Sequence, residues 1–453
     1  MRDRRGKLKV KVFFIFIILI AVSFFVTFSK TFERNAPTIN SESKIYWNTK
    51  DNINIDLADD TGIKKVLIEY SKNDEQERKI LINQSVNAKE LKTLLELPKP
   101  KFNENIEKYI VYVQVVDKSL WNWFSGNVNT KAIEVIVDNK KPQVSILSNS
   151  YSITRGGSAA VVFYAHDDNL DELYIDVNSK IFKATPFIKA NYYISLIAWD
   201  IKDEGFEARI IAKDKANNIV KEHIPYYLTN KKYRVSTINV KDNFIDGKIK
   251  DLYETNSEVQ IDDKGKIFDY VNATLRDENE KIIHKITKVV SNDVVNNFDL
   301  EPFIPLKNGM KVADFGDHRF YKYNDEQISE SYHLGLDLAS TKMAPITLSN
   351  AGKVVFAQDN GIYGLNIIID HGLGLYTLYA HCTKKNVETD DLVSAKKVIA
   401  STGTSGLALG DHLHFGVLVQ GIEVRPEEWM DKNWMNDNIF SIMSKAKDII
   451  HKK

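Results

Sequence analysis

The longest apolar run in the chain lies near its N-terminus, at Val12–Phe28. A run of roughly 17 residues is at the lower limit for a helix that spans a bilayer. Residues 1–11 before it are strongly basic, and positively charged flanks stay in the cytoplasm. The pattern therefore predicts a cytoplasmic tail at 1–11, an uncleaved single-pass anchor at 12–28 and an extracytoplasmic remainder. A cleaved signal peptide is the alternative, although the run exceeds a usual signal core and no clear cleavage site follows it.

Short runs of alternating or β-branched residues, separated by polar turns, follow the apolar segment; examples are Asn52–Asp60, Tyr109–Asp117 and Lys131–Asp138. Alternation with period two predicts β-strands. The pattern also recurs, because "DDTGIKKVLI" at Asp59 resembles "DDNLDELYI" at Asp167. An interval of roughly 100 residues is the usual size of an immunoglobulin-like sandwich. We therefore expect two tandem modules of this kind, at 34–140 and 141–229.

Two pairs of aspartates, Asp59/Asp60 and Asp167/Asp168, occupy equivalent places in the two repeats. Carboxylates at such places could hold calcium, which needs about six or more oxygen ligands. No second acidic cluster lines up convincingly with either pair. The favoured interpretation is that these are turn residues at strand ends.

The pattern changes at 230–300, where apolar residues recur at helical spacing, as in Ile267, Val271 and Leu275. This spacing predicts a helical linker or small regulatory segment. A strand-rich domain is expected at 301–434 and a final helix at 435–453. The expected fold class is therefore mainly β, with one membrane helix, two sandwiches, a helical linker and a C-terminal β domain.

Composition narrows the function classes. Lys+Arg and Asp+Glu both number 61, so the chain lacks the basic excess typical of nucleic-acid-binding proteins. With 43% hydrophobic and 27% charged residues, it can bury several cores. Cys382 is the single cysteine, which excludes an intrachain disulfide and leaves stability to those cores.

Histidines gather in the C-terminal part of the chain. In "GDHLHFGV", alternation places His412 and His414 on one face of a strand, with Cα atoms roughly 6–7 Å apart. His381 ends the apolar run "YTLYA", and "HLGLDLA" supplies His333 and Asp337. A straight strand would hold those two Cα atoms about 13 Å apart, so we expect His333 at a bend before the strand. Three N/O ligands with one open position are typical of catalytic zinc.

Taken in order, "FGDHR", "HLGLDLA", "LYAH" and "GDHLHFGV" resemble the lysostaphin/LytM-type zinc metallopeptidases over about residues 315–429. The resemblance implies an antiparallel-β peptidase domain with one zinc ion per chain. It implies that the ion is held by His333, Asp337 and His414. His381 and His412 are implied to be catalytic and to face a zinc-activated water.

The same resemblance implies hydrolysis of peptide cross-links in bacterial peptidoglycan, and we favour a D,D-endopeptidase. The implied place is the inner membrane, with the catalytic domain in the periplasm. The implied partners are peptidoglycan stem peptides, the membrane through residues 12–28, and cell-wall or cell-shape proteins. The chain departs from the family at Leu409–Asp411, where a Ser/Thr-Gly is usual, and at Cys382, where leucine is common.

Other interpretations stay open. A degenerate LytM-like protein would only activate cell-wall hydrolases, although all five implied residues are present. A cell-envelope binding protein could instead depend on the sandwich modules. The segment 230–300 could cover the zinc site or act as a spacer. Among the remaining candidates, we expect His371 to be structural, His318 to lie at the rim, and Cys382 to be a core residue.

Overall fold

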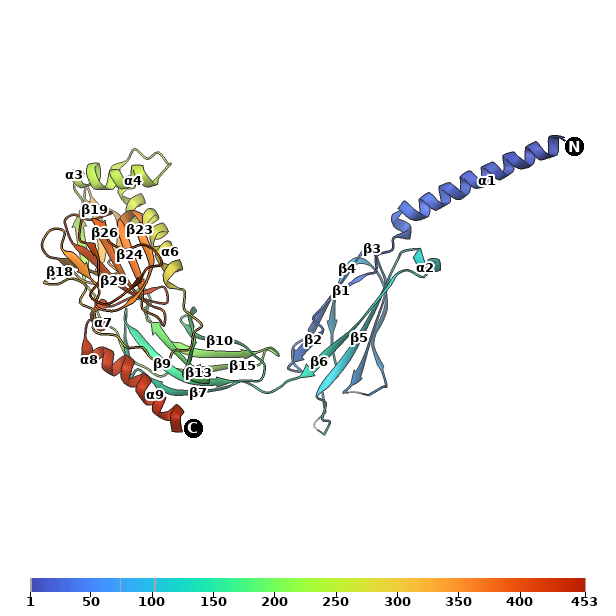
Figure 1. Ribbon diagram of the computed structural model, residues 1–453, viewed down its shortest axis with the longest axis horizontal. Helices are drawn as coiled ribbons and strands as arrows, with labels where there is room; N and C mark the ends of the chain where they lie inside the picture. The colour runs from blue at the N-terminus through green and yellow to red at the C-terminus, as the bar shows by residue number, and fades with distance from the viewer. Residues whose placement is uncertain (1, 74, 102, 453) are drawn as a thin grey trace. The chain divides into compact units, whose positions relative to one another are not determined.

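The computed structural model describes residues 2–73, 75–101 and 103–452, and the chain divides into two compact units (Figure 1). Unit 1 runs from the N-terminal helix to Lys141 and includes Lys213–Ile219. Unit 2 comprises Pro142–Ala212 and the chain from Val220 onward. The fold is mainly β with an N-terminal apolar helix, as expected.

Helix α1 spans Arg2–Phe28. Its segment Lys7–Phe28, 22 residues long, has the length and composition of a membrane span. At 1.5 Å per residue it measures about 33 Å, which matches a hydrocarbon core of about 30 Å. The helix begins before the predicted apolar run because the preceding Lys and Arg residues are themselves good helix formers.

Unit 1 is built on one six-stranded sheet with the order β1-β3-β5-β6-β2, to which β4 adds by pairing with β3. Its strands are β1 Thr38–Asn40, β2 Lys44–Trp47, β3 Ile53–Lys72, β4 Lys79–Leu95, β5 Lys108–Asp117 and β6 Val128–Val137. Strand β5 alternates strictly between buried and half-buried residues, so one face of the sheet carries the core. A short turn of helix, α2 Trp121–Phe124, joins β5 to β6.

The expectation that Asp59 and Asp60 end a strand is wrong, because β3 continues through both. The expectation that no other acidic group lines up with them is also wrong, because carboxylate oxygens of Glu33, Asp59 and Asp117 lie within 4.8 Å of one another. The pairing of β3 with β4 slips between Ala58 and Ile63. Asp59 Oδ1 accepts the backbone N–H of Gly62 at 2.7 Å, and Gly62 has a φ of +112°. The aspartate therefore stabilises a bulge inside a long strand. In the second repeat the expectation is confirmed, because Asp167 caps the turn between β9 and β10 by accepting the N–H of Asn169.

The first part of unit 2 contains two four-stranded sheets, β11-β10-β14-β15 and β12-β13-β9-β7. Their strands are β7 Gln143–Asn149, β9 Ser158–His166, β10 Leu170–Val177, β11 Lys180–Lys183, β12 Thr185–Phe187, β13 Lys189–Ala198, β14 Ala208–Asp214 and β15 Ile219–His223, with a small pair of β8 Ser152–Thr154 and β16 Tyr227–Thr229. Both sheets contribute buried side chains to one core, among them Phe163, Ile175 and Ile194. The immunoglobulin-like identity of the two modules stays a prediction.

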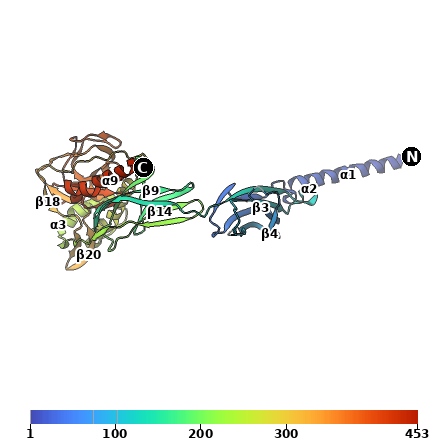
Figure 2. The ribbon, with the colours of Figure 1, turned by 90° about the horizontal axis from the view of Figure 1, so that it is seen from below.

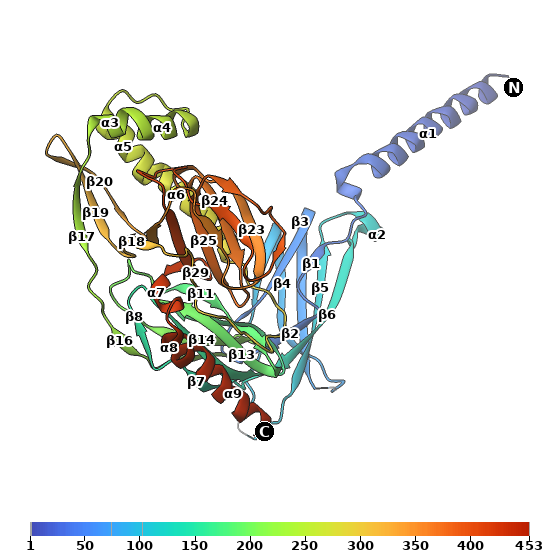
Figure 3. The same cartoon turned by 60° about the vertical axis from the view of Figure 1, so that its left-hand side comes forward.

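Helices follow where helical spacing predicted them, after a strand, β17 Val235–Asn239. They are α3 Asp242–Phe244, the π-helical η2 Ile245–Ile249, α4 Lys250–Asn256, α5 Lys264–Asp269, the π-helical η3 Tyr270–Leu275 and α6 Arg276–Thr287. Their apolar residues, such as Phe268 and Ile283, share a core with Ile368 and Tyr376 of the following domain. Figure 3 shows α6 beside the sheet that contains β24 and β25.

That sheet has eight strands in the order β18-β21-β29-β25-β24-β23-β27, with β30 on β29. They are β18 Met310–Ala313, β21 Leu336–Ala339, β23 Gly352–Asp359, β24 Leu365–Asp370, β25 Leu375–Cys382, β27 Leu392–Val393, β29 Leu413–Val419 and β30 Ile422–Val424. Strands β25 and β29 are buried throughout. Alternate side chains of these strands enter two different cores. One core is shared with the helices between 242 and 287, and the other is shared with the two four-stranded sheets described above.

Two smaller sheets and a set of helices complete unit 2. Strand β17 pairs with β19 His318–Tyr323, which pairs with β20 Glu326–Tyr332; β22 Pro345–Thr347, β28 Val398–Ser401 and β26 Lys384–Lys385 form the other sheet. The C-terminal helices are α7 Pro426–Trp429, α8 Lys432–Met435, the π-helical η5 Asn436–Phe440 and α9 Ser441–Lys452. Helix α9 packs along β7 and β9 (Figures 1 and 2).

A buried polar contact joins the sandwich sheets to the C-terminal helices. Glu428 Oε2 accepts the backbone N–H of Ser158 at 2.9 Å, and Trp429 Nε1 donates to Ser158 Oγ at 3.0 Å. Burial raises the pKa of Glu428 to about 7. Since the folded-state pKa exceeds the unfolded value, the protonated carboxyl contributes stability below the unfolded pKa, and that stability is lost as the pH rises through about 7.

We predict that Glu428→Gln removes this pH dependence, because the amide oxygen still accepts the Ser158 N–H without titrating. The difference between the two proteins should reach about 3 kcal/mol between pH 4 and pH 8. Thermal unfolding of the full chain in detergent across that range measures it. Glu427→Gln is the matched control and should keep the wild-type slope. An unchanged slope in Glu428→Gln would contradict the assignment.

Candidate metal centre and catalytic histidines

Three side chains of unit 2 converge on one point. Strands β21 and β29 pair so that Asp337 lies opposite His414, and His333 lies in the bend between β20 and β21, as expected. His333 Nε2 is 3.0 Å from Asp337 Oδ1 and 3.1 Å from His414 Nδ1. His414 Nδ1 is 3.0 Å from the same carboxylate oxygen. The residues that the resemblance implied as ligands are thus brought together.

The spacing of these three donor atoms fits a zinc ion. Donors about 2.0–2.1 Å from a tetrahedral ion lie roughly 3.3–3.4 Å apart, close to the observed separations. His333 Nδ1 lies 2.7 Å from the carbonyl oxygen of Asp314, which assigns the N–H to Nδ1 and leaves the Nε2 lone pair facing the other donors. Two imidazoles and one carboxylate are a donor set that suits zinc.

A glycine is required beside this group. A Cβ atom added at Gly335 would lie 2.6 Å from His414 Nε2 and 2.7 Å from the carbonyl oxygen of Phe415. Any side chain there would displace the histidine. The central glycine of "HLGLDLA" therefore allows β21 to approach β29 closely enough for the two strands to share the site.

The electrostatics of the group favour a charged carboxylate at Asp337. Burial alone would raise the pKa of Asp337, but His333 and His414 hold it well below the usual range. Burial lowers the pKa of His414, and Asp337 opposes that shift in part. A lowered carboxyl pKa and a lowered imidazole pKa both favour metal binding, because a metal needs an ionised carboxylate and unprotonated imidazoles as ligands.

Two further histidines stand beside the metal group. The rings of His381, near the end of β25, and His412, just before β29, have centroids 4.8 Å apart, and His381 is 5.8 Å from the ring of His414. His381 Nδ1 lies 2.9 Å from the Ser405 carbonyl oxygen and His412 Nδ1 lies 2.7 Å from that of Gly410. These contacts assign the N–H groups to Nδ1 and leave both Nε2 atoms able to accept a proton.

His381 is held in an unusual state. Burial, followed by the neighbouring His414 and His412, lowers the pKa of His381 to about 3, so the ring is neutral at pH 7. Its backbone lies in the left-handed region, with a φ of +60°. Strained backbone of this kind is concentrated at functional sites.

A cleft of about 1050 Å³ opens from the metal group, and β17, η2 and β19 form part of its wall. Its lining includes five cationic side chains: Arg234, Lys241, Lys248, Arg276 and Arg319. Apart from the candidate ligand Asp337, the carboxylates among the described lining residues are Asp317 and Asp411, and both are hydrogen-bonded by neighbouring groups. The five cations outnumber the three carboxylates, so the described lining of the cleft carries an excess of two positive charges.

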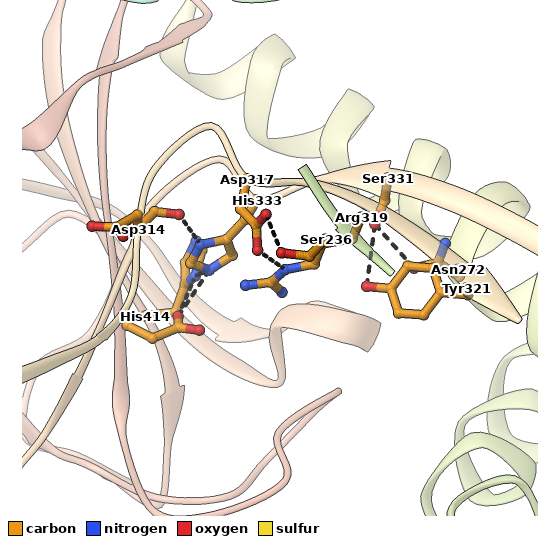
Figure 4. Close-up of polar contacts among 10 residues, drawn as sticks. Ser236, Asn272, Asp314, Asp317, Arg319, Tyr321, Ser331, His333 and His414 are labelled. Carbon is orange, nitrogen blue, oxygen red and sulfur yellow. Dashed lines mark hydrogen bonds and ion pairs between the residues drawn. The ribbon is translucent and has the colours of Figure 1, made fainter. Parts of the chain in front are cut away.

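Arg319, one of these cations, is held in place by an ion pair with Asp317. Asp317 Oδ2 accepts its Nε–H at 3.1 Å, and Asp317 Oδ1 accepts the hydroxyl of Ser236 at 2.7 Å. Figure 4 shows the guanidinium beside Asp317, on the side of His333 and His414. Sequence reasoning missed this residue, although "FGDHR" contained it; the contribution of Ser236 depends on long-range pairing of β17 with β19.

Residues 331–426 match the model of peptidase family M23, and they contain all five of the converging residues. This segment is an M23 peptidase domain of the LytM type. Over 94 residues the chain is 33% identical to the DD-carboxypeptidase/endopeptidase Mpg of Neisseria meningitidis, a match that covers 21% of this chain and 22% of Mpg. Over 112 residues it is 26% identical to the murein hydrolase activator EnvC of Escherichia coli, covering 25% of this chain and 27% of EnvC.

A peptidase M23 structure from Pseudomonas aeruginosa aligns with 61% of this chain and 94% of its own, at 16% identity and a TM-score of 0.39. The chain spans about a quarter of the length of the two curated relatives. The family assignment therefore concerns the M23 domain, and the activity of the whole protein is a matter for proposal.

The remaining candidates in the M23 domain have structural surroundings. His371 Nδ1 lies 2.9 Å from the Ala351 carbonyl oxygen and Nε2 lies 2.7 Å from Thr377 Oγ1. His318 stacks on Tyr332 with ring centroids 4.2 Å apart. Cys382 is buried in the core, and burial raises its thiol pKa to about 12, so it is a poor nucleophile.

We predict that Asp337→Ala and His414→Ala each lose zinc, because each removes one of three donors from a buried site. Metal analysis of the purified full chain should show near-background zinc, while circular dichroism reports an intact β fold. His318→Ala, a histidine outside the donor group, should keep wild-type zinc. Near-stoichiometric zinc in either ligand variant would show that the ligands are wrongly assigned.

The two flanking histidines should behave differently from the ligands. We expect His381→Ala and His412→Ala to retain zinc and to lower turnover by about 100-fold or more, the usual scale for a lost acid–base group. Zinc content and hydrolysis rate are measured on the same preparations. His412 Nε2 lies 3.6 Å from Asp337 Oδ1. Loss of zinc in His412→Ala would therefore mean that His412, and not His414, holds the ion.

Proposed function

We propose that the chain is a membrane-anchored zinc metalloendopeptidase that hydrolyses peptide cross-links of bacterial peptidoglycan, with a D,D-endopeptidase favoured. One observation carries the proposal. The three-donor group of His333, Asp337 and His414 lies beside two further histidines, and all five side chains line one cleft. A structural metal site would be closed by a fourth protein ligand, whereas three donors leave a position open for chemistry.

Zinc bound by the three donors would polarise a substrate carbonyl and lower the pKa of a nearby water. The chain itself supplies the proton acceptors. The Nδ1 atoms of His381 and His412 are both turned to backbone carbonyls, so Nε2 is the nitrogen of each ring that can accept a proton. A histidine that takes a proton at Nε2 can return it to the leaving amine. Until then, the resulting N–H can stabilise the developing oxyanion.

The cleft supports an acidic peptide as the substrate. Peptidoglycan stem peptides carry free carboxylates, and the cleft next to the metal group is lined by Arg234, Lys241, Lys248, Arg276 and Arg319. Arg319 is oriented in advance by Asp317, which lowers the entropy lost when a guanidinium pairs with a carboxylate. Relatives named for DD-carboxypeptidase and endopeptidase activity agree with this substrate class.

Location agrees with the same function. Helix α1 is long and apolar enough to anchor the protein, and the basic residues at its start favour a cytoplasmic N-terminus. We propose a single-pass inner-membrane protein whose M23 domain lies in the periplasm, where it meets peptidoglycan. Cell-wall or cell-shape proteins are further proposed partners, and residues 34–140 and 141–229 are proposed as two modules of one immunoglobulin-like kind.

A second candidate function is activation of other cell-wall hydrolases, which the similarity to EnvC favours. The intact set of donors and flanking histidines argues against it, because an activator has no need of a metal site. The two functions predict different results with purified protein.

The zinc-loaded full chain in detergent should cleave purified cross-linked muropeptides. Mass spectrometry should show dimers converted to monomers with one water gained per cleaved bond, and the masses identify the bond. His381→Ala at equal zinc content should lower the rate by about 100-fold or more. Intact dimers with the zinc-loaded wild type, together with stimulation of a separate hydrolase, would instead support the activator.

A further inference from the structure

The loop between β5 and β6 of unit 1 exposes a cluster of large aromatic side chains. Trp123 is 94% exposed and Phe124 is 63% exposed, and Trp121 lies beside them on α2. Large aromatic side chains are normally among the more buried residues of a folded protein. A tryptophan with almost its whole surface in solvent needs a physical reason.

The backbone of this loop is strained at the same residues. Asn122, Trp123 and Phe124 have φ angles of 49°, 54° and 68°, in the left-handed region that costs free energy for residues with a Cβ atom. Such strain persists where the surrounding structure imposes it. The conformation that turns the aromatic rings outward is therefore enforced.

The base of the loop supplies the enforcement. The buried Asp117 Oδ1 accepts the backbone N–H groups of Ser119 at 3.0 Å and Asn127 at 2.7 Å. Gly126 has a φ of +90°, and a Cβ atom there would lie 2.7 Å from the carbonyl oxygen of Asp117. A rigid base thus presents an apolar tip.

The same base is joined to the end of the candidate membrane helix. Leu120 N–H donates to the carbonyl oxygen of Thr31 at 2.7 Å, and Ser119 Oγ donates to that of Glu33 at 2.7 Å. Thr31 follows the end of α1 at Phe28 by three residues, a reach of at most about 10 Å. If α1 spans a bilayer, the base of the loop must lie at the surface of that bilayer.

We propose that the aromatic loop, defined as Trp121–Phe124, inserts into the lipid headgroup region of the membrane that α1 crosses. Tryptophan is enriched at this depth because its ring is apolar and its N–H is polar. Lys30 and Arg34 lie between α1 and the first strand, and basic side chains at this place pair with anionic headgroups. The loop is then a second anchor, which holds the Asp117 end of β5 at the bilayer and directs the Lys108 end away from it.

The inference rests on the anchoring proposed for α1 and is independent of hydrolysis. The full chain is reconstituted into vesicles of phosphatidylethanolamine and phosphatidylglycerol, with Cys382→Ser and one nitroxide label. The label at Ser125→Cys, in the loop, should be accessible to lipid-soluble oxygen and shielded from a water-soluble nickel chelate. The matched label at Asn103→Cys, before the Lys108 end of β5, should show the reverse preference.

Trp123→Ser combined with Phe124→Ser should return the Ser125 label to the aqueous pattern while the protein stays in the vesicles. Trp123→Phe should keep the wild-type pattern. A Ser125 label as accessible to the nickel chelate as the Asn103 label would overturn the inference and leave α1 as an anchor. Failure of the chain to float with the vesicles would overturn both the anchor and the loop.

Discussion

The pairing register of β21 with β29 is the constraint on which the M23 site depends. Leu336 lies opposite Phe415 and Leu338 opposite Leu413, and all four are buried in the core. The pair between them, Asp337 and His414, faces the other way and supplies two of the three donors. Because side chains alternate along a strand, a slip by one residue would expose the core and bury the ligands. Core packing and the positions of the candidate donors are thus fixed by one register.

The surrounding structure supplies the other histidines of the site, which do not come from β21 or β29. Strand β25 lies next to β29, with Ala380 opposite His414, so His381 emerges beside the metal group. His333 comes from outside the strand, because the chain bends before β21 and Gly335 allows the close approach. The two central strands are buried on both faces, by the sandwich sheets on one side and by the helices of 242–287 on the other. This double burial explains why the ligands can stay fixed without a disulfide.

The sequence could predict features whose signal is local. The period-two alternation in "HLHF" placed His414 on a strand, and the impossible 13 Å span of a straight "HLGLD" placed His333 at a bend. Helical spacing found the helices near Ile267 and Val271. The bulge at Asp59 escaped prediction because it depends on pairing with a distant strand. The cationic residues that line the cleft, Arg319 among them, were not predicted. They come from β17, the helices and β19, and no local sequence pattern connects these segments.

Two largely buried carboxyl groups, those of Glu428 and Asp337, have pKa values shifted in opposite directions. Glu428 has Arg425 at 3.6 Å, and burial dominates, so its pKa rises to about 7. Asp337 is also buried, yet two imidazoles at 3.0 Å hold its pKa below the usual range. Burial favours the neutral forms of the imidazoles around Asp337. The negative charge of its carboxylate is then not fully balanced unless a cation binds beside it. A divalent ion bound at the point where the three donors meet, as proposed above, would supply that compensation.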